Sequence, residues 1–497
     1  MGTQVSHKLK IASWIAVGAV AGALTTVQLQ AVARGTLAPL PLEELQQFAA
    51  VFGMVKSDYV EPVDEKQLIS DAISGMVSSL DPHSQYFDKK AFKEFREGTS
   101  GRFVGVGIEI SMEDGLVKVV TPIEDSPAFR AGLKSGDLIT KIDDTAVKGL
   151  SIGQAVKLMR GEPRTKVLLT IYRKSEDRSF PVTITREEIK TQSVKAKKVE
   201  DGYLWVRVSQ FQDRTVEDFA RKIEDLYKAD PKIKGVVLDL RNDPGGLLDA
   251  AVAISAAFLP ENATVVSTNG QLADSKSVYT ATPAYYLRRG GPDPIQHLTE
   301  TTQGLLKTVP LVVLVNEGSA SASEIVAGAL QDHKRAKILG NQTFGKGSVQ
   351  TVRPLGPDTG IKLTTARYYT PSGKSIQAKG IVPDVLIDET AEGNLFAGLR
   401  TREADLSKHL TNGKEAAAGS KPMTDAERAA EQKRDREREA ARQRLENEAK
   451  KNPGQSLMPE FGSEKDFQLQ QALNQLKGQP VLVSKTLTER SDEKKEN

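Results

Sequence analysis

The sequence contains no cysteine and only five histidines. The absence of cysteine excludes disulfide bonds, thiolate catalysis and metal sites with cysteine ligands. The histidines form no H-E-x-x-H pair or similar spacing, which argues against a zinc site. An excess of one charge is also lacking, because 68 basic and 65 acidic residues leave a net charge of +3, so the totals do not favour a nucleic-acid partner. The 497 residues suffice for roughly three packed domains.

The stretch from residue 311 to residue 350 carries the clearest indication of chemistry. Leu311–Val315 is an apolar run with the composition of a buried strand. A turn of small residues, 316–323, follows and opens a helical segment, 324–330. A serine on such a strand-to-helix turn presents its hydroxyl beside the free amides of the helix N-terminus, which suits a nucleophile, although most serines at such places are simply helix caps.

Lys346 stands between two glycines further along this stretch. A lysine can act as the base for a serine nucleophile only if burial lowers its pKa toward neutrality. Glycine on both sides lets the backbone bend sharply and approach another element. Gly340–Lys346 also fits the opening of a phosphate-binding P-loop, but position 347 is glycine where that motif needs serine or threonine, and a strand-like pattern follows where it needs a helix.

The first 33 residues predict export. His7, Lys8 and Lys10 precede an apolar run, Ile11–Val27, and Ala31–Ala33 supplies a small-residue cleavage site. The pattern is that of a secretory signal peptide, and an uncleaved inner-membrane anchor is the alternative, although the run is marginal for a spanning helix. We therefore expect a protein of the periplasm or cell envelope.

Residues 40–98 predict a helical arm. Apolar residues recur at spacings of three, which indicates a helix with one apolar face; they are Leu42, Leu45, Phe48 and Val51. The segment 80–87 interrupts the arm, and its Asp-Pro pair indicates a turn into the next helix. His83 in this turn is a candidate base, but a lone histidine in a turn is more often a structural hydrogen-bonding group.

Residues 101–188 change to short strands with two helices, an order that resembles a PDZ domain. The expected strands are 103–110, 116–123, 137–142, 166–172 and 180–184, and the expected helices are 127–133 and 151–159. The peptide-binding loop of such a domain falls on Gly105, Val106, Gly107 and Ile108, where backbone amides can converge on the terminal carboxylate of a peptide. A Gly-x-Gly in a strand by itself indicates only a bulge or tight turn.

Residues 190–392 alternate strands and helices, which predicts a layered α/β core. Gly245 and Gly246 lie between an apolar strand and an alanine-rich helix, where exposed amides suit an oxyanion hole or where glycine is needed for a loop with positive φ. Asp243 and His333 offer a Ser-His-Asp triad with a serine of the turn. His333, however, lies near the far end of the helix that this turn opens, roughly 15 Å away, and no G-x-S-x-G elbow is present.

Residues 396–497 predict a charged tail with low apolar content. The stretch 425–451 has no apolar stripe, so it is either a solvated helix or disordered, and it suits tethering or partner contact.

The motif Gly318–Ile325, followed by Phe344–Gly347, resembles the C-terminal processing proteases, which are serine endopeptidases with a Ser-Lys dyad. The nucleophile of that family falls on Ser321, and its general base falls on Lys346, 25 positions later. The residue that positions the lysine falls on Gln350. The segments 80–87 and 371–377 also resemble the family, so the likeness covers about residues 40–390.

This resemblance implies a crotonase-like layered protease core beside the PDZ domain, within a multi-domain α+β chain. One oxyanion donor would be the amide of Ala322 and the other would come from Gly245 or Gly246. The reaction would pass through an acyl-enzyme and use no metal or other cofactor. Substrates would be envelope proteins with accessible C-termini, an adaptor protein could control activity, and the arm would join copies of the chain into a homo-oligomer. The alternative function is a PDZ scaffold that keeps the fold without cleaving.

Overall fold

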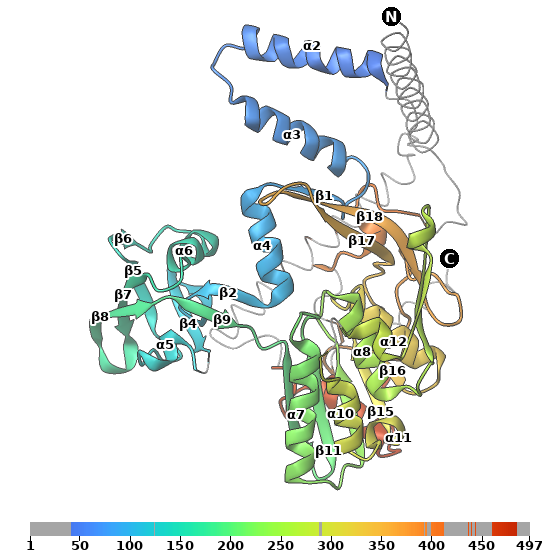
Figure 1. The fold of residues 1–497 in the computed structure, drawn as a ribbon. Helices are drawn as coiled ribbons and strands as arrows, with labels where there is room; N and C mark the ends of the chain where they lie inside the picture. The colour runs from blue at the N-terminus through green and yellow to red at the C-terminus, as the bar shows by residue number, and fades with distance from the viewer. Residues whose placement is uncertain are drawn as a thin grey trace, which may run out of the picture. The chain divides into compact units, whose positions relative to one another are not determined.

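The computed structural model describes residues 41–411 except 124, 288–290, 392 and 395–398, together with 460–484 and the isolated positions 436, 439 and 443 (Figure 1). The predicted signal segment, 1–33, lies outside these residues, as does most of the predicted tail. The chain forms two compact units, one ending at Ile73 and the other beginning at Ser74.

The N-terminal unit consists of α2, Leu42–Asp58, and most of α3, Glu65–Ser78. The side chain of Asp64 accepts hydrogen bonds from the amides of Lys66 and Gln67, which fixes the start of α3. No residue of α2 is buried. None of the helices in the described part of the chain is long and apolar enough to cross a membrane.

The last part of the predicted arm belongs to the larger unit. Strand β1, Gln85–Phe87, pairs with β18, Gly360–Tyr369, in antiparallel register. Helix α4, Lys89–Ser100, then begins at Asp88, whose side chain caps the amide of Ala91. The predicted interruption of the helical arm at residues 80–87 is therefore present, but it ends in a strand that joins a sheet of the core and is more than a turn.

The predicted peptide-binding module is a small antiparallel sheet with two helices. Its strands are β3, Ile108–Glu113, β4, Leu116–Pro122, β5, Leu138–Ile142, β6, Thr145–Ala146, β7, Lys166–Arg173, and β8, Arg178–Thr185; its helices are α5, Pro127–Arg130, and α6, Ile152–Met159. The order is β3-β4-β5-β7-β8, which leaves β3 at an edge. The first expected strand is divided at Val106 and Gly107 into β2, Arg102–Gly105, and β3, and β2 pairs instead with β9, Glu187–Lys190.

The core contains a six-stranded sheet in the order β10-β11-β12-β15-β16-β19. These strands are β10, Val194–Glu200, β11, Tyr203–Val208, β12, Gly235–Asp239, β15, Leu311–Val315, β16, Lys337–Gly340, and β19, Val385–Leu386. All pairs are parallel except β10 with β11. The predicted α/β layering is confirmed by this sheet and the helices that cover it.

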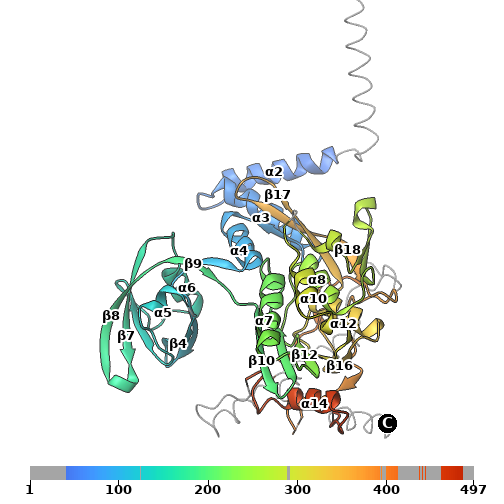
Figure 2. The same ribbon diagram turned by 60° about the horizontal axis from the view of Figure 1, so that its bottom comes forward.

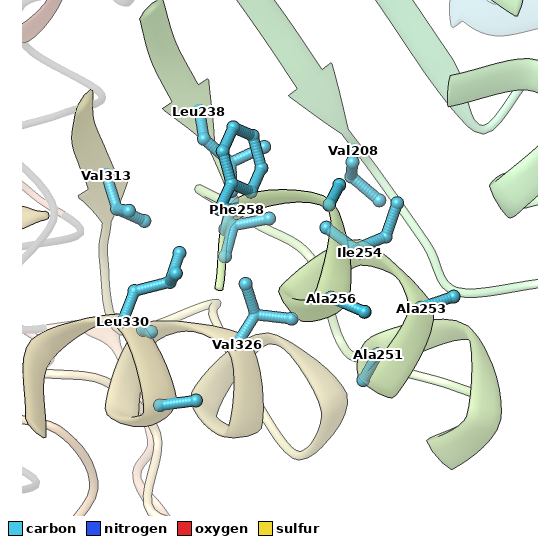
Figure 3. Close-up of a cluster of buried hydrophobic side chains, with 14 of the residues drawn as sticks. Val208, Leu238, Ala251, Ala253, Ile254, Ala256, Phe258, Val313, Val326 and Leu330 are labelled. Atoms are coloured by element: carbon cyan, nitrogen blue, oxygen red, sulfur yellow. The ribbon is translucent and has the colours of Figure 1, made fainter. Parts of the chain in front are cut away.

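Alternate residues of the central strands point to opposite faces of this sheet, as strand geometry requires. Leu238 on β12 and Val313 on β15 pack with α8, Leu248–Phe258, and α12, Ala322–Asp332, as Figure 3 shows. Helix α7, Thr215–Ala229, covers the same face.

The opposite face of the sheet is covered by the C-terminal segment, residues 460–484. Figure 2 shows its helix α14, Phe467–Leu476, beside the strands of this sheet. The helix buries Leu469 and Leu473 against residues such as Val237 and Leu314. A charged tail is therefore not a correct description of this segment. The apolar spacing of Leu469, Leu473 and Leu476 after an Asp466 cap is a helix signal that the average composition of the tail hides.

A second sheet lies beside the first in the chain's larger unit. Its strands are β1, β13, Thr264–Gly270, β14, Ser277–Thr280, β17, Ser348–Pro354, and β18. Strands β17 and β18 form a hairpin. The remaining short helices are α9, Pro283–Tyr286, α10, Pro294–Thr301, and α11, Leu305–Thr308, with 3-10 turns at Lys174–Glu176, Ala273–Ser275 and Glu403–Asp405.

Candidate active site

Ser321 lies where the buried strand β15 has turned into helix α12. It occupies the N-cap position and is almost entirely buried. Its φ is +56°, a value that residues other than glycine rarely adopt and that costs on the order of 1–3 kcal/mol. The surrounding turn holds this conformation, because Ser319 Oγ donates to Leu240 O at 2.7 Å and Ala320 N donates to Asp243 O at 2.9 Å.

Gly245 lies directly beside this serine, and Gly246 follows it against the backbone of Phe211. A Cβ on Gly245 would come within 2.8 Å of both Ser321 Cβ and Ala322 N, and a Cβ on Gly246 would come within 2.0 Å of Phe211 O. Both glycines also have positive φ. Only glycine fits at these positions, and the loop 241–246 thereby approaches Ser321 closely at Gly245.

The two glycines differ in what their amides do. Gly245 N donates to Asp243 Oδ1 at 2.8 Å, and Gly245 is buried. Gly246 is exposed, and its amide has no acceptor within the described part of the chain. The amide of Ala322 likewise has no acceptor there, since it opens helix α12. Two free backbone donors therefore stand near Ser321, from Ala322 and Gly246.

Lys346 lies in an irregular segment, residues 341–347, between β16 and β17. Burial lowers the pKa of Lys346 to about 8, and the nearby positive charge of Lys362 lowers the pKa as well. Within the described residues its ammonium group makes no hydrogen bond, and the carboxyl groups of Glu403, Glu324 and Asp81 act on it only at a distance. A Cβ on the following residue, Gly347, would lie 2.2 Å from Gln377 N, which explains the need for glycine there. The segment continues into a strand and not into a helix, which excludes the P-loop interpretation.

The side chain of Glu324 joins the serine and lysine segments. Its Oε2 accepts from Ser321 N at 2.8 Å and from Lys346 N at 2.9 Å, so these two backbone nitrogens lie within about 6 Å of each other. Its Oε1 accepts from Gly345 N at 2.7 Å and from Thr343 Oγ1 at 2.5 Å. The carboxyl group is completely buried, and burial raises its pKa to about 7 in spite of these four donors.

Glu324 belongs to the motif Gly318–Ile325, but no role for this residue is predicted from the sequence. The spacing Ser-x-x-Glu at a helix start is that of a capping box, in which the glutamate reaches back to the N-cap amide. This signal predicts the contact with Ser321. The contacts with Lys346 and Gly345 join segments that lie more than twenty positions apart, so only the tertiary structure reveals them.

Gln350 lies on β17, close in sequence to Lys346. Its Nε2 donates to Ser348 Oγ at 2.9 Å and to Thr364 Oγ1 at 3.2 Å, and Thr364 in turn donates to Asp81 Oδ1. No hydrogen bond between Gln350 and Lys346 is present among the described residues. The role of Gln350 as the residue that orients Lys346 stays a prediction.

His83 is connected to the lysine segment through Glu403. Its Nε2 is 2.7 Å from Oε2 of the buried residue Glu403, whose Oε1 accepts from Gln377 Nε2 at 2.8 Å. Glu403 N also donates to Phe344 O. These contacts fit a structural role for His83, and they place residue 403, which sequence reasoning assigned to the tail, against the segment that carries Lys346.

The alternative triad is not assembled. His333 Nε2 contacts Thr264 O at 2.7 Å at an exposed position, whereas the Asp243 carboxyl is buried beside Gly245. Burial raises the pKa of Asp243 well above its usual value, so this carboxyl favours the neutral form. Within the described residues, no cluster of three or more histidine, aspartate or glutamate side chains is arranged to hold a metal.

The predicted peptide-binding loop joins β2 to the edge strand β3. Gly107 has a φ of +81°, and a Cβ there would lie 2.3 Å from Ser126 Cβ. The loop is held by Ala128 N, which donates to Val106 O at 2.9 Å, and by Ser126 Oγ, which donates to Gly107 O at 2.8 Å. Gly105 and Ile108 are the residues at which the two strands meet this loop.

Comparisons with known proteins agree with this architecture. The model for peptidase family S41 matches residues 202–387, that for the PDZ domain matches residues 104–184, and that for the activating protease CtpB N-terminal domain matches residues 15–91. The PDZ-type module is thus confirmed.

The chain is also similar to individual proteins. The chain is 42% identical over 381 residues to a carboxy-terminal-processing protease of Bartonella bacilliformis, covering 76% of this chain and 83% of that protein. It is 39% identical over 346 residues to a "Probable CtpA-like serine protease" of Staphylococcus aureus, covering 69% and 65%. Among solved structures, the photosystem II D1 C-terminal processing protease is 31% identical, with 69% and 86% covered and a TM-score of 0.39. Because the first of these relatives is matched over most of its length, the chain belongs to peptidase family S41 and is a serine-type peptidase of the carboxy-terminal-processing group.

Proposed function

We propose that this peptidase is an endopeptidase that cuts proteins through an acyl-enzyme, with Ser321 as the nucleophile and Lys346 as the general base. The observation that carries the proposal is the shared carboxylate: one oxygen of Glu324 accepts from the backbone amides of both residues. The pKa of Lys346 of about 8 leaves a useful fraction of the amine neutral near neutral pH.

The reaction begins when Ser321 Oγ transfers its proton to neutral Lys346 Nζ and bonds to the carbonyl carbon of the substrate. The carbonyl electron pair moves onto oxygen, and the amides of Ala322 and Gly246 would bind this oxyanion. Collapse breaks the C–N bond, and Lys346 gives its proton to the leaving amine. Water then gives a proton to Lys346 and adds to the ester, and breakage of the C–O bond returns the proton to Ser321.

The PDZ-type module would capture the C-terminal end of the substrate. Strand β3 lies at the edge of its sheet, so an extended peptide can add beside it, with its carboxylate at the loop Gly105–Ile108. Binding of a peptide with a free C-terminus to the full chain, and weaker binding of the same peptide with an amidated C-terminus, tests this step. Equal binding of the two peptides would contradict it.

We also propose a location and partners for this enzyme. Export to the periplasm or cell envelope, through a cleaved signal peptide or an inner-membrane anchor, would place the enzyme among envelope substrates and a regulating adaptor protein. Helix α2 exposes a continuous set of apolar side chains, which would join two copies of the chain; they are Leu42, Leu45, Phe48, Val51 and Met54. Fractionation of cells tests the location, and sedimentation of a Phe48→Asp variant beside a Gln47→Glu control tests the self-association.

Incubation of the Ser321→Ala variant with an unstructured protein tests the nucleophile. We expect cleavage by the parent enzyme and none by the variant, with both folded by circular dichroism. Equal cleavage by both would overturn the mechanism. Absence of cleavage by the parent, with and without candidate adaptors, would favour the scaffold function.

A further inference from the structure

A buried ion pair connects the C-terminal segment to the loop that approaches Ser321. Arg241 is completely buried and begins the loop 241–246. Its Nη1 and Nη2 donate to the two carboxylate oxygens of Asp466 at 2.8 and 2.6 Å, and Nη1 also donates to Gln468 Oε1 at 3.1 Å. The ring of Phe461 lies 4.1 Å from the guanidinium carbon. Three residues of the segment 460–484 thus contact one side chain of the core.

We propose that Asp466 is a positioning residue for catalysis, which holds the loop 241–246 through Arg241 in the place where its backbone amides can receive the oxyanion. The inference rests on the proposed function. It makes the C-terminal segment a working part of the active site, although that segment lies about eighty positions beyond the end of the matched S41 region.

The geometry of Asp466 suits this role because its carboxylate has no freedom to move. It caps helix α14 by accepting from Leu469 N at 3.2 Å, and it accepts from Gly462 N at 2.8 Å. Helix α14 itself is fixed by burial of its apolar side on the sheet. The bidentate contact with a planar guanidinium adds a defined orientation as well as energy.

Arg241 in turn is connected to the oxyanion donors by a short and rigid path. On its other side the guanidinium donates to Asp239 at the end of β12, at 2.9 and 2.6 Å. Arg207 Nη1 donates to Arg241 O at 2.8 Å, and the next residue, Asn242, is held by Asn316 of the serine turn. Gly246 follows four positions later. A displacement of Arg241 therefore moves the loop that carries the amide of Gly246. It also moves the turn that carries Ser321, through the hydrogen bonds between Asn242 and Asn316.

Asp466 could act only by stabilising the fold or also by positioning the loop 241–246. Two kinds of variant distinguish these roles. Asp466→Asn keeps the size of the side chain but removes the charge that pairs with Arg241. Leu473→Ala removes apolar contacts of the same helix on the sheet side, where no catalytic group lies. The full chain is used, and kcat, KM and the melting temperature are measured with an unstructured peptide substrate.

We expect Asp466→Asn to lower kcat by about ten- to hundredfold with little change in KM, since loss of alignment by a fraction of an ångström has effects of this size. Leu473→Ala should lower the melting temperature at least as much, yet keep kcat within about twofold. Asp466→Glu, which keeps the charge, should recover part of the rate.

Three results would overturn the proposal: unchanged kcat in Asp466→Asn, equal losses of kcat in Asp466→Asn and Leu473→Ala, or a change confined to KM. Should Asp466→Asn fail to fold, Gln468→Ala decides the question, because it removes one hydrogen bond to Arg241 and one to Ile387 O. Gln468→Ala should lower kcat about threefold or more. An unchanged kcat counts against the proposal. Failure of the proposed function is distinguishable, because it would appear as cleavage that persists in Ser321→Ala.

Discussion

The two segments that carry the proposed dyad are built in different ways. The serine turn, residues 316–321, lies between β15 and α12, both of which are buried along nearly their whole length. The lysine segment, residues 341–347, has no regular structure, and its amides are held by side chains from elsewhere. Gly345 and Lys346 donate to Glu324, and Gly347 N donates to Gln377 Oε1 at 3.0 Å.

The difference indicates how each position responds to change. The serine turn follows from a local pattern, a buried strand followed by a capped helix, so its disruption disrupts the core. The lysine segment depends on a few hydrogen bonds to distant residues, so its position can change while the core remains folded. Substitutions around Lys346 should therefore lower the rate more than they lower stability.

The largest effect is expected from removal of the lysine amine. Lys346→Ala should lower kcat by about a thousandfold or more, because general base catalysis commonly contributes on the order of 10²–10⁴ and the alanine leaves no substitute. The melting temperature should change little, since the ammonium group makes no hydrogen bond among the described residues and its burial already disfavours the charged form. Lys374→Ala, at an exposed lysine in the segment 371–377, is the matched control. A fully active Lys346→Ala enzyme would exclude lysine as the base.

The next effect is expected from the residue that joins the two segments. Glu324→Gln should lower kcat about a hundredfold. The carboxylate accepts four hydrogen bonds on its two oxygens, and the glutamine has an NH₂ group in place of one of these oxygens, so some of the bonds are lost and the two segments separate. Active-site labelling of Ser321 and kcat measurements check this, with the exposed residue Glu217 changed to Gln as the control. A loss no greater than in the control would show that the segments stay aligned without the carboxylate.

The same residue predicts a dependence of stability on pH. The pKa of Glu324 is raised in the folded protein, from a usual value near 4.5 to about 7, so the folded state holds this proton more tightly than the unfolded state. The free energy of unfolding should therefore fall by about 3 kcal/mol as pH rises from 4.5 to 7, compared with the Glu324→Gln variant. Chemical unfolding of both proteins across this range measures the difference. If the parent protein became more stable relative to Glu324→Gln as pH rises, the raised pKa of Glu324 would be contradicted.

A smaller effect concerns the pH dependence of the rate. Activity should increase as pH rises through the pKa of Lys346 at about 8, because only the neutral amine is a base. The positive charge of Lys362 lowers this pKa, so Lys362→Met should move the midpoint of the rate profile to higher pH. Rates with one substrate from pH 6 to about 10 check this. A midpoint that stays in place or moves to lower pH would show that Lys362 does not act on the base.

The smallest effect is expected at Gln350. Its side chain donates hydrogen bonds to Ser348 and Thr364, so Gln350→Ala should lower kcat only about fivefold, as for the loss of about 1 kcal/mol of hydrogen bonding. A loss as large as that in Lys346→Ala would instead show that Gln350 orients the lysine directly in the working enzyme.

Local sequence patterns predicted most of the elements near the site. The apolar run 311–315 is β15, and the serine cap begins α12, as expected. The strand order of residues 101–188 predicted the peptide-binding module. These predictions succeed because strand burial, helix capping and turns with glycine depend on neighbouring residues.

Two assignments failed for the opposite reason. Residues 85–87 lie in the segment predicted to interrupt the helical arm as a turn, but they form a strand that pairs with β18, nearly three hundred positions away. Residues 460–484 lie in a predicted charged tail but cover one face of the core sheet. In both cases a long-range partner outweighs the average composition of the surrounding stretch.

The amino-acid sequence by itself determined which side chains are available for chemistry, a serine on a helix cap and a lysine between glycines, since these follow from residue type and local spacing. Only the tertiary structure decided how the two backbone segments that carry them are joined, through the carboxylate of Glu324, and what holds the loop 241–246, through Asp466 and Arg241. The physical reason is that a buried carboxylate must find its hydrogen-bond donors wherever the folded chain places them, and their distance along the sequence has no influence on that choice.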